Sequence, residues 1–360
     1  MIAAKLKIAV LYDLWEPEAP APPPEEATPR ARKRKPARRR KKEKHDREEI
    51  FESLEKLGHQ PYYHVLDGRS QPLSALMKSD ADLVFNLVES FAGDDTMDMN
   101  VAAYLDLIDL PYTGAGPHAH MLAQNKAIAK KMFAFHGIKT PFFAQAYRGA
   151  LDHAHDIKFP LIVKPVAEDG SIGIGADAVV DSVKELMERI EYIQDEFDSP
   201  ALIEEYIEGR EIYGAILGSY ERTEALPLIE LDLSKLPKGV PRIASQDVKF
   251  DKETDAYKLT KSAVCEDLDE ATAKKLSDTA IAAYRAVKLR DYGRIDMRLT
   301  PKGEVYVIEA NPNPWLASRQ EFAMAAKASG LSYTELIGTI VDLAMSRYLN
   351  ASMANAAGMH

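Results

Sequence analysis

The stretch from Arg294 to Pro314 constrains the fold most strongly, because two alternating runs flank a predicted hairpin turn at 300–303. If Lys302 and Gly303 form a two-residue loop, residues placed symmetrically about that loop face each other. Side chains alternate between the faces of a strand, so one face is polar and the other turns to the core. The polar face pairs Asp296 with Glu309 and Arg294 with Asn311, and the core face holds Ile295, Met297, Ile308 and Ala310.

A second register is open at this turn. Pro301 followed by Gly303 also suits a type I turn with a bulge, which shifts the pairing by one residue. Asp296 would then face Ile308, and charge would mix with core. Because a one-residue slip is costly where one face is buried, we favour the first register.

The polar face has the chemistry of a cation site. Asp296 and Glu309 at cross-strand distance repel each other unless a cation lies between them, and Asn311 adds an amide oxygen. An oxygen-only set of this kind suits Mg²⁺. Arg294 beside it is a partner for phosphate or for a developing oxyanion. The alternative is an exposed sheet face whose charges pair only with solvent.

Composition limits the class of protein. A chain of 360 residues should hold two or three subdomains with ample core. Its single cysteine, Cys265, excludes an internal disulfide and fits a reducing compartment. No apolar run reaches membrane length, and the N-terminal residues lead into a strand pattern instead of a signal peptide. We therefore expect a cytoplasmic protein that does not enter a membrane.

The N-terminal part begins like a Rossmann β-α-β unit whose first loop has been lengthened. A predicted strand at 7–12 precedes a Pro-, Ala- and Glu-rich stretch, a basic run at 30–44, and a helix from about residue 46. We expect 16–45 to be disordered, because it cannot bury apolar area. The basic run has eleven Lys or Arg against one Glu, which leaves a net charge of −20 on the rest of the chain. It is either a solvated tail or a contact for an acidic partner.

Two lysines and a glycine-rich loop predict a phosphate site. Lys126 lies on a helix predicted from His120 to His136, and Lys164 lies near the end of an apolar strand, where a lysine is rarely placed for packing. The loop that follows contains Gly170 and Ser171, whose N–H and hydroxyl groups can close on an anion. Glu89 ends another strand, and ligands bind at strand ends in α/β folds.

These motifs, taken in order, resemble the ATP-grasp ligases and, among them, the D-alanine–D-alanine ligase family. The resemblance covers about residues 82–345 and the first strand. The motifs that carry it are Pro111-Tyr112-Thr113-Gly114, Lys126, Val163-Lys164-Pro165, the 170–173 loop, Ile203-Glu204-Glu205, Gly209-Arg210-Glu211, Gly293-Arg294-Ile295-Asp296 and Glu309-Ala310-Asn311.

The resemblance implies a fold and a set of roles. The fold is an ATP-grasp fold of α/β and α+β units: an N-terminal Rossmann-like subdomain (1–118), a central subdomain (119–200), a C-terminal subdomain (201–348) and a flexible tail (349–360). ATP is clamped between the last two subdomains.

The resemblance also implies roles for single residues. Lys126 and Lys164 would hold the α- and β-phosphates, Ser171 with its loop would cover the β- and γ-phosphates, and Lys249 would meet the γ-phosphate. Glu204, Glu205 and Ile207 would read adenine, Glu211 the ribose, and Asp296, Glu309 and Asn311 would bind Mg²⁺, with Mn²⁺ as a substitute. Arg294 would steady the oxyanion.

The sequence departs from the family where amino acids are recognised. The long insertion replaces the family's early Gly-rich loop and its Glu. Glu89-Ser90 stands in place of a His-Gly pair. After Asn311 the chain runs through Asn313 to Ser318 and Arg319 instead of the family's Pro-Gly and serine-bearing helix. Glu89, Asn313, Ser318 and Arg319 are therefore the candidate substrate contacts.

We predict an ATP-dependent carboxylate–amine ligase that forms an amide or peptide bond through an acyl phosphate. Its substrates would be small, amino acids or peptides, with recognition altered from a D-alanine pair. Two alternatives remain: a D-alanine–D-alanine ligase of cell-wall synthesis, and a nucleotide-binding regulator without chemistry. The retention of Arg294, Asp296, Glu309 and Asn311 argues against the regulator. A homodimer is compatible with this prediction.

Overall fold

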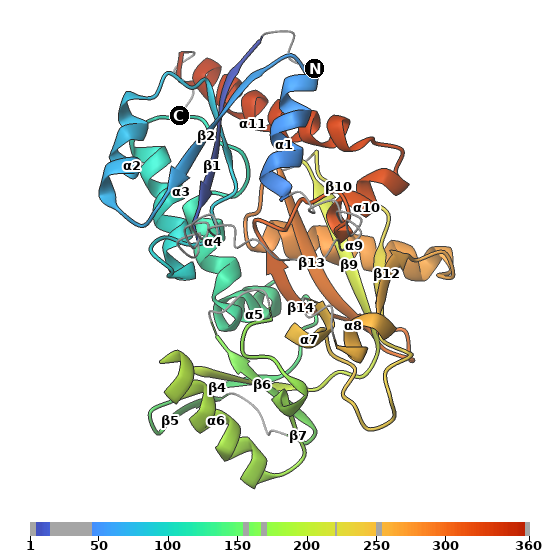
Figure 1. Ribbon diagram of the computed structural model, residues 1–360. Coiled ribbons are helices and arrows are strands. Elements are labelled where there is room, and N and C mark those ends of the chain that lie inside the picture. Colours follow the sequence, from blue (N-terminus) through green and yellow to red (C-terminus); the bar gives the residue numbers. More distant parts are fainter. Residues whose placement is uncertain are drawn as a thin grey trace, which may run out of the picture.

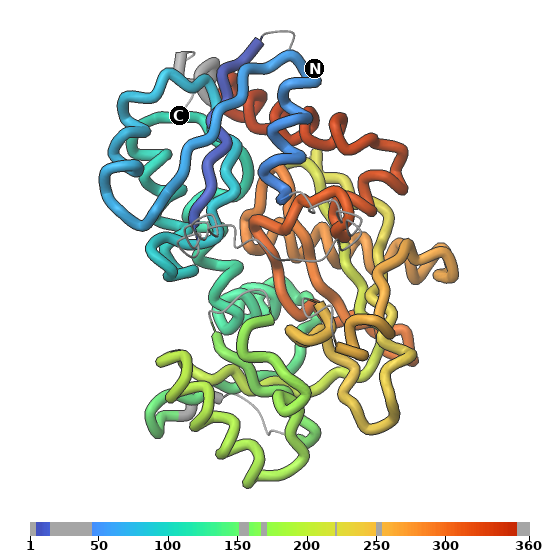
Figure 2. Tube along the Cα trace, in the orientation of Figure 1, coloured from blue at the N-terminus to red at the C-terminus, as the bar shows by residue number. Residues whose placement is uncertain are grey.

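The computed structural model describes residues 5–14, 45–153, 158–166, 171–219, 222–249 and 254–356, so the predicted insertion and Gly170 lie largely or wholly outside the described residues. Three sheets form the molecule. Figure 1 and Figure 2 place the N-terminal sheet and α11 at one end, the central sheet at the other, and the largest sheet alongside both. Among the described residues, no helix is long and apolar enough to cross a bilayer.

The N-terminal unit is a parallel sheet in the order β2-β1-β3, as the Rossmann-like pattern predicts. Ile8 and Val10 pack with α1 and α11 on one face, and Ala9 and Leu11 pack with α3 on the other, so the strand is buried on both sides. Its elements are β1 (Lys7–Asp13), α1 (Asp46–Lys56), β2 (Gln60–Leu66), α2 (Ser70–Ala75), η1 (Leu76–Lys78), β3 (Leu83–Asn86), η2 (Asp95–Met97) and α3 (Asp98–Leu107).

The central unit is a five-stranded sheet in the order β5-β4-β8-β6-β7, with α6 packed on it. Ser182 caps α6 by accepting a hydrogen bond from the N–H of Glu185, and the Glu185 carboxylate accepts one from the N–H of Asp181, the residue before the N-cap. Its elements are β4 (Phe143–Tyr147), β5 (Ala150–His153), β6 (Leu161–Pro165), η3 (Ala176–Ala178), β7 (Val179–Val180), α6 (Val183–Phe197) and β8 (Ala201–Glu205). The strand at 201–205, expected to open the C-terminal subdomain, thus pairs within the central sheet.

The third sheet has the order β12-β11-β9-β13-β14, with β10 on β9. Helix α9 covers one face, and α10 and α11 cover the other. Its elements are β9 (Arg210–Leu217), β10 (Glu224–Ala225), β11 (Ile229–Asp232), α7 (Gln246–Lys249), α8 (Asp255–Leu259), β12 (Lys261–Val264), α9 (Glu270–Ala286), β13 (Tyr292–Leu299), β14 (Val305–Asn311), α10 (Glu321–Ala328) and α11 (Tyr333–Ala356). Helix α11 thus continues into the predicted tail.

The helix predicted from His120 to His136 is wrong as a single element. It is divided into α4 (Pro117–Gln124) and α5 (Lys126–Phe135). Asn125 between them has an extended backbone (ψ 93°), and its Oδ1 accepts the N–H of Ile128, so it is the N-cap of α5. Both helices pack against the third sheet, which places Lys126 at the first turn of a helix facing that sheet.

The hairpin at 292–311 combines the two registers that the sequence left open. The turn is a type I turn with a bulge: Gly303, at φ 73°, donates to Thr300, and Thr300 N–H donates to Glu304. Near the turn the pairing is therefore the shifted one, with Met297 opposite Val307. An irregularity between Asp296 and Met297 then restores the predicted pairing at the polar end of the hairpin.

Because of that irregularity, the predicted core orientation of Ile308 is wrong. Asp296 faces Glu309 and Arg294 faces Asn311, as the favoured register requires. The extra residue in β14 is Ile308, and it lines the pocket beside Glu309 instead of joining the core. Val307 takes the core position with Ile295, Met297 and Ala310.

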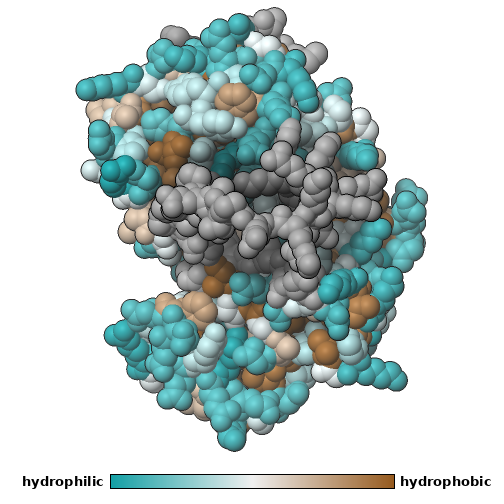
Figure 3. All heavy atoms as spheres, in the orientation of Figure 1, coloured by the Kyte–Doolittle hydropathy of each residue, from teal (hydrophilic) through white to brown (hydrophobic). Residues whose placement is uncertain are grey.

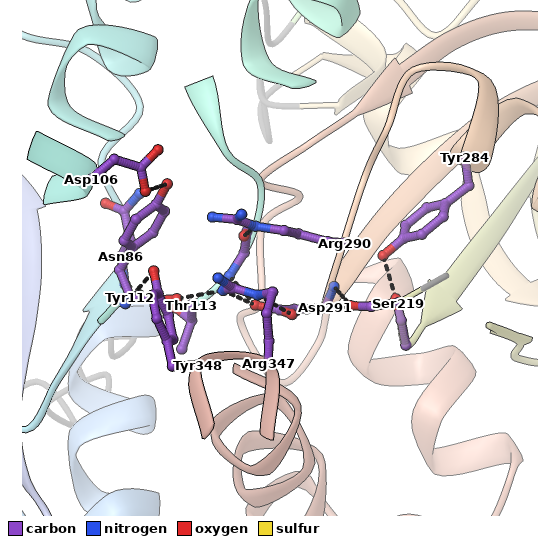
Figure 4. A network of polar contacts seen from close by, with 12 residues as sticks. Asn86, Asp106, Tyr112, Thr113, Ser219, Tyr284, Arg290, Asp291, Arg347 and Tyr348 are labelled. Atoms are coloured by element: carbon purple, nitrogen blue, oxygen red, sulfur yellow. Dashed lines mark hydrogen bonds and ion pairs between the residues drawn. The ribbon is translucent and has the colours of Figure 1, made fainter. Parts of the chain in front are cut away.

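A buried carboxylate ties the N-terminal unit to the third sheet (Figure 4). Asp291, which is fully buried, accepts hydrogen bonds from Gly114 N–H (2.9 Å) and from Arg347 Nη2 (2.8 Å). Arg347 also donates to the Tyr112 carbonyl, and Asn313 donates to the Val88 carbonyl. Gly114 and Arg347, from two separate segments, therefore hold the residue just before β13.

Candidate functional site

The candidate site lies in a pocket between the central and third sheets. Its walls come from α5, β6, β8, α7, β13 and β14, and its empty volume, part of which is open to solvent, is about 690 Å³. Ten of the predicted site residues line it: Lys126, Lys164, Ser171, Glu204, Glu205, Ile207, Glu211, Lys249, Asp296 and Glu309. Residues far apart in the sequence thus converge on one cleft.

Arg294 and Asp296 form the most ordered pair of the site. Nε and Nη2 of Arg294 donate to the two carboxylate oxygens of Asp296, at 2.7 and 2.9 Å. The remaining nitrogen, Nη1, lies 3.7 Å from Glu321 Oε2 at the start of α10. Tyr213, the residue opposite Asp296 on β9, stacks beneath the guanidinium at 4.8 Å. The arginine is held in one orientation by these three neighbours.

The two facing carboxylates differ in acidity. Burial raises the pKa of Asp296 to about 6, although Arg294 acts against that shift. Burial also disfavours ionised Glu309, but the cations around it, led by Lys126 and Lys164, outweigh burial and lower its pKa to about 2. One carboxylate is thus firmly ionised, and the other would gain from an additional cation.

Three lysines surround these acids. Lys126 Nζ lies 3.9 Å from Glu309 Oε2, across the cleft from the central sheet. Lys164, on β6, is buried, and its Nζ lies 3.0 Å from Glu204 Oε2. Lys249 ends α7, with its Nζ 5.6 Å from the Tyr213 ring. The pocket therefore presents positive charge on several sides, which suits a polyphosphate.

The described part of the glycine-rich loop is anchored to the segment before α7. Ser171 has a left-handed backbone (φ 62°), and its hydroxyl donates to the Ala244 carbonyl at 2.7 Å. The N–H of Gln246 donates to the Ile174 carbonyl. Gly173, at φ 70°, leaves no room for a Cβ, which would lie 2.9 Å from Pro165. Close packing and a positive φ thus explain a glycine in this loop.

The predicted adenine and ribose contacts divide into two groups. Glu205 and Ile207 line the pocket at the end of β8. The carboxylate of Glu204 instead lies between Lys130 Nζ (2.9 Å) and Lys164 Nζ (3.0 Å), where it is almost fully buried. Glu211 also lines the pocket, and its Oε2 lies 2.7 Å from Arg298 Nε.

Sequence reasoning missed three residues of the site. Lys130 is fully buried, and burial lowers its pKa to about 8 although Glu204 acts against that shift. The sequence could have indicated Lys130, because it follows Lys126 by one helical turn on the same face of the helix. Arg298 lies two residues after Asp296 on β13 and so shares its face. No local pattern singled out Glu321, which reaches Arg294 only through tertiary packing.

The predicted substrate contacts lie outside the residues that line this pocket. Asn313 accepts the Tyr292 hydroxyl hydrogen bond at 2.6 Å and donates to the Val88 carbonyl. Ser318 donates through its N–H and hydroxyl to the Glu49 carboxylate at 2.7 and 2.8 Å. Glu89 and Arg319 are exposed. Three of these four residues therefore follow Asn311, on the path from β14 to α10.

The outer surface adds no extended apolar patch in the view of Figure 3, where most of the coloured atoms are hydrophilic and the hydrophobic ones are scattered. The described residues contain no group of three or more His, Cys, Asp or Glu side chains that could hold a metal. A cation at the hairpin would therefore need the amide oxygen of Asn311 beside Asp296 and Glu309.

Comparison with known proteins supports the same assignment. A family model described as "D-ala D-ala ligase C-terminus" matches residues 131–342. A D-alanine–D-alanine ligase of Bordetella petrii is 34% identical over 285 residues, which is 78% of this chain and 81% of that protein. The uncharacterised protein y4sG of Sinorhizobium fredii is 32% identical over 305 residues, 83% of this chain and 87% of that one.

Solved structures share the fold. The D-alanine–D-alanine ligase of Bacillus anthracis, complexed with ATP, superposes with a TM-score of 0.69 at 21% identity, over 97% of this chain and all of that one. The VanG D-Ala:D-Ser ligase of Enterococcus faecalis gives 0.59 at 24% identity, over 74% of this chain and 73% of that one.

The protein is an ATP-grasp enzyme, an ATP-dependent ligase that forms carbon–nitrogen bonds. More narrowly, the chain belongs to the D-alanine–D-alanine ligase family. The predicted fold class, family and ligase activity are thereby confirmed.

Proposed function

We propose that this ligase uses Mg²⁺–ATP in the described cleft to join an amino-acid or peptide-like carboxylate to an amine, with substrates other than a D-alanine pair. The γ-phosphoryl group would pass to the carboxylate oxygen, giving an acyl phosphate and ADP. The amine nitrogen would then attack the carbonyl carbon. The carbon–oxygen bond to phosphate would break, and the amine would lose a proton.

One observation carries the proposal: the cross-strand pair of Asp296 and Glu309 faces a pocket lined by Lys126, Lys164 and Lys249. Lysines of this kind bind phosphate as point charges. In the proposed arrangement Lys126 and Lys164 contact the α- and β-phosphates, and Lys249 and Ser171 approach the γ-phosphate. Glu205 and Ile207 face adenine, and Glu211 faces the ribose, while the Glu204 carboxylate is occupied by two lysines.

The hairpin residues fit a divalent cation. Asp296, Glu309 and Asn311 offer only oxygen ligands, which suits Mg²⁺ and tolerates Mn²⁺. The buried amide nitrogen of Asn311 has no hydrogen-bond partner among the described residues. No described contact of that nitrogen therefore fixes the orientation of the amide group. The cation, when bound, would neutralise phosphate charge. Arg294, fixed by Asp296 and Glu321, would be the donor for the oxyanion of the tetrahedral intermediate.

The altered specificity is supported by the candidate substrate contacts. The hydroxyl of Ser318 donates to Glu49, and the amide of Asn313 bonds to Tyr292 and Val88. Neither group could bind the carboxylate of a substrate without giving up one of these hydrogen bonds. A D-alanine pair remains the competing substrate set, because relatives at 30% identity or more carry that name. The basic run at 30–44 would serve as a contact for an acidic substrate or partner.

The test is phosphate release from Mg²⁺–ATP with a panel of amino acids and dipeptides, D-alanine included. Product masses would identify any amide. We expect release that depends on a substrate outside the D-alanine pair. Turnover with D-alanine alone would overturn the altered specificity, and a folded protein that binds no ATP would overturn the site.

A further inference from the structure

Lys130 is a fully buried lysine that does not line the nucleotide pocket, yet it contacts both sides of the cleft. It lies on α5, which packs on the third sheet. Its Nζ donates to Thr140 Oγ1 at 3.0 Å and to the Ile308 carbonyl at 3.3 Å. Toward the central sheet, the same nitrogen lies 2.9 Å from Glu204 Oε1. A buried ammonium with these partners requires an explanation beyond packing.

The contact with Glu204 extends to a second lysine. Glu204 Oε2 lies 3.0 Å from Lys164 Nζ, so each oxygen of this carboxylate forms an ion pair with one lysine. Lys130, Glu204 and Lys164 all have side chains that are nearly or completely buried. Two positive charges and one negative charge leave this bridge with a net charge of +1. Of its two lysines, Lys164 is the one that lines the pocket.

The charge balance decides how strongly Lys164 can attract a phosphate. If Glu204 faced Lys164 alone, the pair would be neutral, and the carboxylate would compete with any phosphate for the ammonium. A second lysine on the other oxygen offsets that carboxylate. In a buried site such interactions are screened less than in water, so the difference should be measurable.

We propose that Lys130 is a positioning residue that keeps Lys164 available to the nucleotide by balancing the carboxylate of Glu204. Lys130 itself does not touch the ligand. The inference rests on the nucleotide site proposed above and adds to it the source of the site's positive charge. It also assigns Glu204 a role in electrostatic balance instead of adenine recognition.

A structural role for Lys130 must be separated from this electrostatic one. Its bond to the Ile308 carbonyl lies next to Glu309, and the Thr140 hydroxyl donates to the neighbouring Val307 carbonyl at 2.9 Å. Removing the lysine could therefore disturb β14 as well as Glu204. A second substitution that restores the charge, without restoring the contact to Ile308, distinguishes the two roles.

The experiment measures the Kd of ADP and of adenosine by calorimetry, in EDTA so that no divalent cation contributes. The variants are Lys130→Met, Glu204→Gln and the double variant, with Lys131→Met, an exposed neighbour, as matched control. We expect Lys130→Met to raise the Kd of ADP by about 10- to 100-fold. Adenosine, which has no phosphate, should bind unchanged, and Lys131→Met should behave as the native protein. The double variant, whose bridge again carries one net positive charge, should regain most of the ADP affinity.

Two results would overturn the inference: equal weakening of adenosine and ADP by Lys130→Met, or no recovery in the double variant. If Lys130→Met does not fold, Glu204→Gln alone still decides, because the inference requires it to bind ADP at least as tightly as the native protein. Failure of the native protein to bind ADP or ATP would instead overturn the proposed nucleotide site.

Discussion

Arg294 donates two parallel hydrogen bonds to the carboxylate of Asp296, which lies two residues further along the same strand. Bidentate pairing of this kind fixes the plane of the guanidinium. The third nitrogen is directed toward Glu321, at 3.7 Å. The residue proposed for the oxyanion is therefore oriented before any substrate binds, which is how an electrostatic catalyst avoids reorganisation during the reaction.

Replacement of Arg294 by lysine should affect turnover more than nucleotide binding. Lysine keeps the charge but cannot present parallel N–H donors to Asp296 or to an oxyanion. Loss of one such donor costs about 10²–10³ in kcat, so we expect a decrease of that order with little change in the Kd for ATP. Calorimetry and phosphate release measure the two quantities. Arg285→Lys, at an exposed position on α9, is the control. A parallel loss of ATP affinity would make Arg294 a phosphate ligand.

Replacement of Glu309 by glutamine should abolish turnover and weaken the binding of Mg²⁺–ATP, while the protein still folds. Glu309 is ionised by its surrounding cations and faces the pocket instead of the core, so glutamine removes charge with little change in packing. Glu304→Gln, at a partly exposed position just before β14 and outside the pocket lining, should leave turnover intact. Thermal unfolding would verify that both variants are folded. Normal turnover in Glu309→Gln would contradict the metal assignment.

The hairpin illustrates how far local sequence can specify a site. Alternation predicted the pairing of Asp296 with Glu309, whereas the bulged turn that Pro301 and Gly303 form was only the alternative to the favoured two-residue loop, because the two features require different registers. The chain satisfies both by an extra residue at Ile308. The local sequence does not identify Ile308 as the extra residue. Its position depends on tertiary contacts: its carbonyl accepts a hydrogen bond from Lys130 on α5, and its side chain lines the pocket.

The remaining differences also depend on tertiary contacts. Asn125 lies within the predicted helix, and the hydrogen bond of Lys126 N–H to the Val166 carbonyl, a long-range contact, helps to explain why the chain turns there. The strand at 201–205 joins the central sheet because β6 and β4 flank it, a long-range pairing that composition does not reveal. Lys164 was recognisable as a lysine in an apolar strand, whereas the sign of Lys130 in the sequence was weaker, its spacing of one helical turn after Lys126.

Cys265 should react slowly with alkylating reagents in the native protein. Burial, followed by the charge of Glu230, raises the pKa of its thiol to about 12. The thiolate is the reactive form, so a raised pKa means less reactive species at every pH below it. At pH 8 about one thiol in ten thousand would be ionised. The rate with iodoacetamide should rise about tenfold per pH unit between pH 8 and 10, and should increase sharply in urea. Equal rates in the native and unfolded protein would contradict this expectation.

Arg347 should stabilise the fold through Asp291, as Figure 4 suggests. Asp291 is fully buried, and Arg347 is its cationic partner among the described residues, at 2.8 Å. Removing one partner leaves a buried charge uncompensated, so Arg347→Met should lower the free energy of unfolding by about 3 kcal/mol. Urea unfolding followed by circular dichroism measures this change. Arg285→Met, at an exposed site, should change stability little.

A double variant separates the charge from the lost packing of the arginine. Asp291 has a left-handed backbone (φ 63°), a conformation that asparagine tolerates well, so Asp291→Asn removes the charge without backbone strain. An asparagine oxygen can still accept the N–H of Gly114. The loss in Arg347→Met with Asp291→Asn should therefore be smaller than the sum of the two single losses, by at least about 1 kcal/mol. Strict additivity would mean that Arg347 stabilises the loop through Tyr112 and Tyr348 instead of through the buried carboxylate.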